Sequence, residues 1–188
     1  MDKSSPVTAA IWMSGALLSF VLMAVGAREL SSDLHTYQLL AVRSVIGLVI
    51  LLIIGFAFRL PFELKTPAWP THIVRNIFHF MGQYGWFLGL GLLPLGEVFA
   101  LEFTVPFWTA ILAATFIGES LNKRTLTSII LGFIGVLIIV KPGSALFQPA
   151  AFWVLAAALC YSVAYICTKK LSATTTPFSI LFFMCLVQ

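Results

Sequence analysis

The sequence predicts an all-α polytopic membrane protein from its composition, its repeated apolar runs and the placement of its charges. Of 188 residues, 60% are hydrophobic and 10% are charged, and the mean hydropathy is +1.02. Soluble domains usually carry about 25% charged residues. Eleven basic and seven acidic side chains are too few to form the charged surface of a soluble protein of this size. This composition excludes an ordinary cytosolic enzyme, a disordered tail and a nucleic-acid-binding domain.

Six apolar segments are read as transmembrane helices, because a helical span needs about 20 apolar residues. They cover residues 8–27, 37–58, 71–92, 95–117, 126–140 and 149–168. A seventh run begins at Pro177 and stops at Gln188, which is too short to cross. We therefore expect about six full spans and a truncated seventh from a longer protein. The connections are short and contain turn formers such as Pro61 and Pro142, so none can hold a soluble domain.

Lysine and arginine gather at alternate ends of these spans. One side carries Lys3, Arg59, Lys65, Lys123, Arg124, Lys169 and Lys170, with Arg75 just inside the third span. The other side carries only Arg28 and Lys141. Cytoplasmic loops are enriched in Lys and Arg, so we expect the N-terminus in the cytoplasm.

The start of the chain resembles its later part when shifted by 141 residues. The register holds without a gap and matches Trp12 with Trp153, Phe20 with Tyr161, and Leu30–Ser31 with Leu171–Ser172. An odd number of spans in the first copy turns the second copy upside down, an arrangement found in many secondary transporters. The shift predicts one five-helix repeat over residues 1–143 and the start of an inverted repeat over 144–188.

The segment EVFALEFTVPFWTAILAATFIGESLNKRTLTSIILGFIGVLIIVKP, residues 97–142, resembles the fourth and fifth helices of EamA-type permeases of the drug/metabolite transporter superfamily. The matching features are the mid-helix Pro106, the Gly118–Glu119 helix end, Gly132, Gly135 and, in the second span, Arg43. The resemblance implies ten helices in two inverted repeats of five, in a bacterial cytoplasmic (inner) membrane. It also implies transport of a metabolite without naming the cargo.

Two charged residues inside the predicted spans are candidates for a binding or coupling site. Arg43 and Glu102 both lie roughly 10 Å below the outer boundary, at a rise of about 1.5 Å per residue. A lone buried charge costs several kcal/mol, so we expect them to meet or to share a water or substrate. A helix-tying ion pair with no contact to cargo is the alternative. Pro106 frees the carbonyl of Glu102 and can kink the fourth span.

The third span carries a polar stripe at helical spacing. One face holds His72, Arg75, Asn76, His79, Gly82, Gln83 and Trp86, and the opposite face holds Ile73, Ile77, Phe80, Tyr84, Phe87 and Leu88. A polar face in a membrane helix must contact protein or water. His79 could couple cargo to protons or be a hydrogen-bonded packing residue, and Trp86 could stack on a planar cargo.

Small residues in two helices indicate close helix packing. Gly85 with Gly89, and Gly132 with Gly135, would let neighbouring helices approach each other. We expect these pairs to support the fold. The tryptophans Trp12, Trp86 and Trp108 could shape a pocket.

These patterns together favour a membrane permease that moves a small polar or amphipathic metabolite by alternating access, with possible proton coupling. The candidate binding or coupling residues are Arg43, His79, Gln83, Trp86, Glu102 and Trp108. We expect no cofactor and no metal, since the sequence has no HExxH, GxSxG or P-loop motif. Two alternatives stay open: an intramembrane enzyme that uses His79 and Glu102, and a non-transporting assembly subunit.

Overall fold

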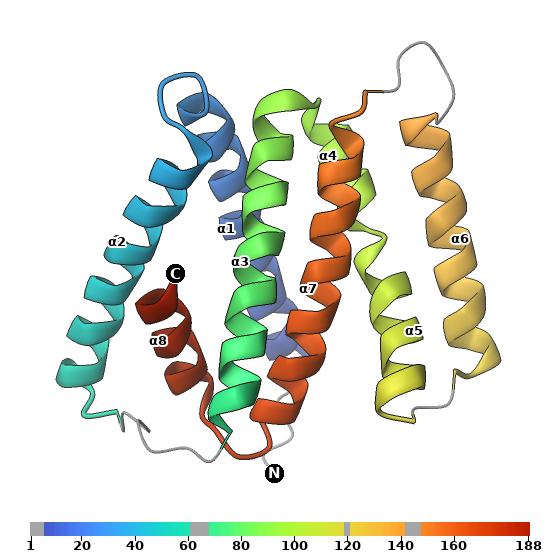
Figure 1. Ribbon diagram of the computed structural model, residues 1–188. Coiled ribbons are helices and arrows are strands. Elements are labelled where there is room, and N and C mark those ends of the chain that lie inside the picture. Colours follow the sequence, from blue (N-terminus) through green and yellow to red (C-terminus); the bar gives the residue numbers. More distant parts are fainter. Residues whose placement is uncertain (1–5, 61–67, 119–120, 142–147) are drawn as a thin grey trace.

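The computed structural model describes residues 6–60, 68–118, 121–141 and 148–188, and every regular element in these ranges is a helix (Figure 1). The helices are α1 (Pro6–Leu30), α2 (Thr36–Ala57), α3 (Trp69–Leu92), α4 (Leu95–Glu102), α5 (Val105–Phe116), α6 (Lys123–Val140), α7 (Ala151–Leu171) and α8 (Pro177–Val187). The predictions on Lys3, Pro61, Lys65, Glu119 and Pro142 lie outside the described residues.

Five helical stretches in the described ranges are long and apolar enough to cross a membrane: α1, α2, α4 together with α5, α6, and α7. The all-helical membrane fold is therefore confirmed. α3 has 24 residues but is not among the five, because its polar face lowers its hydropathy. α8 is a shorter apolar helix. Of the six predicted full spans, five therefore have the required length and hydropathy. The other, which is α3, has the required length only.

Local sequence signals place several helix ends. The side chain of Asn122 accepts a hydrogen bond from Thr125 N at 2.7 Å and begins α6. Within the predicted span 95–117, α4 ends at Glu102 and α5 starts at Val105. Pro106 has no N–H to donate to the Glu102 carbonyl, which explains why the helix breaks there. The predicted kink is confirmed.

α3 lies at the centre of the bundle and packs most extensively on α7 (Figure 1). α2 and α8 pack together on one side of α3, and α5 and α6 lie beyond α7 on the other. Glycines allow the close α3–α7 approach. A Cβ on Gly85 would lie 2.8 Å from the Trp153 carbonyl oxygen, and one on Gly89 would overlap Val154. The packing role predicted for Gly85 and Gly89 is confirmed.

The second glycine pair behaves differently. No atom of the described chain lies within 4 Å of a Cβ built on Gly132 or Gly135. Both residues border an apolar groove of about 570 Å³ between α5 and α6. The packing role predicted for this pair is wrong for the described structure, since the small side chains leave open space and draw no helix close.

The turn after α1 matches the turn after α7 in detail. α1 ends at Leu30 and α7 at Leu171, while α2 begins at Thr36 and α8 at Pro177, so each pair differs by 141 positions. Equivalent backbone bonds close both turns: Leu34 N to Leu30 O at 2.9 Å and Thr175 N to Leu171 O at 2.8 Å. The helices that precede these turns, α1 and α7, run in opposite directions (Figure 1).

The α3–α7 contact predicts the effect of adding one methyl group. We expect Gly85→Ala to destabilise the protein by about 1–3 kcal/mol, because the new Cβ meets a backbone oxygen that cannot move aside. Gly15→Ala is the matched control, since a Cβ on Gly15 meets nothing within 4 Å. Thermal unfolding in detergent should show a lower midpoint for Gly85→Ala only. Equal midpoints for the two variants would contradict this packing.

Candidate functional site

The polar face of α3 points into the bundle. His72, Arg75, Asn76, Gln83 and Trp86 are buried, whereas Ile73, Ile77 and Tyr84 on the opposite face are exposed. The predicted stripe is therefore confirmed for these residues. Phe87 is a correction: it is only 5% exposed, because α2 covers its ring with Arg43.

Trp86 and Glu102 form the central polar contact of this region. The indole N–H of Trp86 donates to Glu102 Oε2 at 2.8 Å. Trp86 is 1% exposed and its ring packs against Phe20 at 5.2 Å between centroids. Phe99 on α4 lies next to both rings. The bond thus joins α3 to the break between α4 and α5, and α1 covers it.

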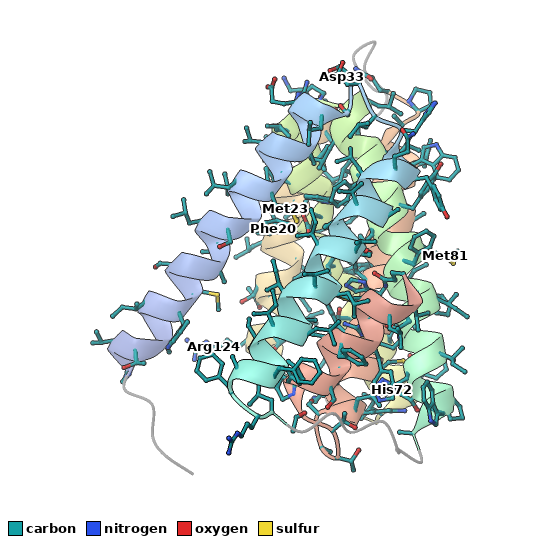
Figure 2. The ribbon with its side chains drawn as sticks, turned by 90° about the vertical axis from the view of Figure 1, so that its left-hand side faces the viewer. Phe20, Met23, Asp33, His72, Met81 and Arg124 are labelled. Atoms are coloured by element: carbon teal, nitrogen blue, oxygen red, sulfur yellow. The ribbon has the colours of Figure 1, made fainter. Side chains whose placement is uncertain are left out.

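A pocket of about 400 Å³ opens beside this bond. Its lining comes from α1, α4, α5 and α7, with the connecting Phe103: Leu17, Phe20, Val21, Phe99, Glu102, Phe103, Val105, Pro106 and Tyr165. Figure 2 shows Phe20 on the side of α1 that faces the bundle, while the N-terminal half of α1 stands away from the other helices. Aromatic walls with one carboxylate suit a planar ring that carries a positive charge.

Arg43 lies in a separate small pocket between α1, α2 and α3. Its Nη1 approaches Met23 Sδ at 3.9 Å, and its guanidinium lies 5.6 Å from the centre of the Phe87 ring. Its Nε has no hydrogen-bond partner in the described ranges. The pocket has a volume of about 240 Å³, and Arg43 is its one charged lining residue.

The expected direct meeting of Arg43 and Glu102 is wrong for the described residues. Glu102 bonds to Trp86, whereas the Arg43 guanidinium contacts the Met23 thioether and lies over the Phe87 ring. Trp86 and Phe87 are adjacent on α3, and their ring centroids are 5.3 Å apart. A shared substrate or water remains a prediction.

Tyr161 and Tyr165 of α7 complete the region, and sequence reasoning missed both. Tyr161 is buried, and its ring packs on His79 with the centroids 5.6 Å apart. Tyr165 stacks on Tyr161 at 6.1 Å and lines the Glu102 pocket. The available signal was the shift of 141 residues, which places Tyr161 on Phe20.

The remaining residues that the sequence analysis singled out lie outside the lining of the Glu102 pocket. His79 Nδ1 lies 3.0 Å from Gln188 Nε2, and no contact joins His79 to Glu102 in the described structure. Gln83 is 4% exposed and its Oε1 lacks a partner among the described residues. Trp108 packs on Phe107 and is not brought to the pocket. Trp12 is 77% exposed, so its predicted pocket role is wrong for the described structure.

Comparison with known proteins identifies relatives of the same kind. The model of the EamA-like transporter family matches residues 7–141. An S-adenosylmethionine uptake transporter of Rickettsia bellii is 27% identical over 94% of this chain and 60% of its own length. A riboflavin transporter of Rhizobium johnstonii is 28% identical over 94% of this chain and 59% of its own length. A pseudopaline exporter of Pseudomonas aeruginosa is 25% identical over 89% of this chain and 59% of its own length.

The chain spans about 60% of the length of the curated relatives that it matches. No solved structure matches it. The family model covers well over half of the chain, from α1 to the end of α6, and the relatives carry transporter names. The chain belongs to the EamA-like transporter family.

Proposed function

We propose that the chain is part of a secondary carrier that moves a small metabolite with a planar ring and a positive group by alternating access. The Trp86–Glu102 bond beside an aromatic pocket is the observation that carries this proposal. In that pocket the carboxylate attracts the positive group, and the rings of Phe20 and Tyr165 stack on the planar part. Arg43 attracts a carboxylate or a phosphate of the same cargo.

The names of the relatives support this choice of cargo. S-adenosylmethionine combines a purine ring with a sulfonium cation, and riboflavin has a large planar ring system. Relatives are named as transporters of each. Both compounds have a planar ring system beside polar groups, which agrees with a pocket whose lining is aromatic and aliphatic apart from one carboxylate and one phenol.

Two inverted copies would give this carrier its two access states. In our proposal, residues 1–143 form the first copy and 144–188 begin the second, within a ten-helix protein. The shared turn geometry after α1 and α7, and the opposite directions of these helices, support the proposal (Figure 1). Binding sites of such carriers lie between the copies near mid-membrane. Tyr161 and Tyr165 of the second copy reach that position from α7.

The described charges support an N-terminus in the cytoplasm. Arg59, Lys123, Arg124, Lys169 and Lys170 lie at the end of the bundle where the chain starts, and Arg28 and Lys141 lie at the other end (Figure 1). An excess of basic residues marks the cytoplasmic side. We infer that the carrier resides in the cytoplasmic (inner) membrane of a bacterium.

The arrangement of the polar groups favours a carrier over the alternatives. An assembly subunit would be expected to pair Arg43 with Glu102 in a dry interior, whereas each borders its own pocket. An enzyme would need His79 and Glu102 to converge, and no contact between them exists in the described ranges. If transport uses protons, His79 and Glu102 are the titratable groups of the pathway that would carry them.

The orientation can be tested at two equivalent turn positions. Ser32 and Ala173 are 141 residues apart, and both are exposed. In a variant with Cys160, Cys167 and Cys185 replaced by alanine, we expect Ser32→Cys to react with a membrane-impermeant maleimide in whole cells. Ala173→Cys should react only after the cells are lysed. Labelling of both positions from the same side would contradict the inverted arrangement, and the reverse pattern would contradict the orientation.

The cargo site can be tested by removing its charge. We expect Glu102→Gln in the full-length carrier to lower S-adenosylmethionine uptake at least tenfold, about 1.4 kcal/mol of lost binding, because a neutral amide does not attract a sulfonium ion. Glu97→Gln is the matched control in the first turn of the same helix. Riboflavin uptake should fall less, since riboflavin carries no positive group. Equal effects of the two substitutions on S-adenosylmethionine uptake would refute the assignment.

A further inference from the structure

We propose that Arg75 is a second anion-binding position in this core, so that the cargo carries a carboxylate or phosphate along with its positive group. This inference rests on the proposed function and deepens it, because it fixes the charge pattern of the cargo. Arg75 lies in the second turn of α3, on the same face as His79, Gln83 and Trp86. Eleven residues separate it from Trp86, roughly 16 Å along the helix axis.

The guanidinium of Arg75 is buried and held in place, but no acidic side chain among the described residues pairs with it. The residue is 5% exposed. Its Nε donates to Thr168 Oγ1 at 3.3 Å and its Nη1 donates to Asn76 Oδ1 at 2.9 Å, and both acceptors are neutral. The Asn76 amide in turn donates to the Phe183 carbonyl at 3.4 Å. α7 and α8 thus fix the orientation of the guanidinium without neutralising it.

Among the described residues, the charged groups of the core do not balance. Four acidic residues lie in the described ranges, Glu29, Asp33, Glu97 and Glu102, and none forms an ion pair with Arg75 there. Within the core, two guanidinium groups (Arg43 and Arg75) face one carboxyl group (Glu102). One positive charge therefore remains when all three are ionised. An uncompensated buried charge is costly, so the core favours a ligand that brings an anion.

Arg75 belongs to the same region as the proposed cargo pocket. Thr168, which accepts from Arg75 Nε, lies one turn after Tyr165 on α7, and Tyr165 lines that pocket. His79 lies one turn after Arg75 on the same face of α3. A guanidinium presents a planar fork of donors that matches the two oxygens of a carboxylate or phosphate.

Inorganic phosphate tests this position without knowledge of the cargo. The thermal unfolding midpoint of the purified full-length protein is measured in detergent against phosphate concentration, with ionic strength held constant by sodium chloride. We expect phosphate to stabilise the unchanged protein, Glu102→Gln and the control Glu97→Gln, which changes a carboxylate in the first turn of α4 and leaves the contacts of Arg75 in place. Arg75→Gln should need at least tenfold more phosphate for the same shift.

The conservative variant keeps the test decisive if Arg75→Gln does not fold. Arg75→Lys retains the charge but loses the fork, so its half-effect concentration of phosphate should rise well above that of Glu97→Gln. The absence of any phosphate effect on the unchanged protein would overturn the proposal. It would also be overturned if Arg43→Gln lost the phosphate response while both Arg75 variants kept it, since the anion would then bind at Arg43 alone.

A second arm separates this proposal from the proposed function. S-adenosylmethionine has a carboxylate, and its decarboxylated form lacks only that group. We expect the unchanged protein to bind the first at least tenfold more tightly, and Arg75→Gln to show a smaller preference, because only Arg43 would then attract the carboxylate. Failure of both compounds to bind, with a phosphate response that depends on Arg75, would refute the cargo and leave the anion position standing. An unchanged preference in Arg75→Gln would refute the anion position alone.

Discussion

The burial of polar groups on α3 is the constraint on which the rest of the structure depends. Hydrocarbon cannot satisfy those groups, so that face must lie against protein or water. α7 covers it closely because Gly82, Gly85 and Gly89 carry no side chains that would hold the helices apart. The α4–α5 break then brings Glu102 to Trp86. Helix packing and the candidate site therefore follow from one requirement.

Two charged groups of the core each have an aromatic partner on α3. Glu102 is held by Trp86, while Arg43 lies over Phe87, the next residue on the helix. Among the described residues, the acid and the base do not pair with each other, and each lies beside its own pocket. In the proposed function, a cargo with charges of both signs would interact with both groups at once.

Much of this was predictable from sequence because the signals were local. Helical spacing identified the buried face of α3, proline placed the α4–α5 break, and Gly85 with Gly89 indicated a tight contact. The failures concern which partner lies opposite. Periodicity alone could not show that α2 covers Phe87, or that Gly132 lacks a neighbour. Depth in the membrane placed Arg43 and Glu102 in one layer but gave no information on what separates them laterally.

The proposed transport function requires water to reach the α3 face at Gln83, and labelling at that position tests this requirement most directly. Gln83 is buried with an unpartnered oxygen among the described residues, and Ile77 lies on the outer face with 51% exposure. In the full-length carrier without native cysteines, Gln83→Cys should react with a charged thiosulfonate at least tenfold faster than Ile77→Cys. S-adenosylmethionine should slow that reaction. A Gln83→Cys that reacts no faster than Ile77→Cys would contradict the account, because the polar face would then be a sealed packing surface.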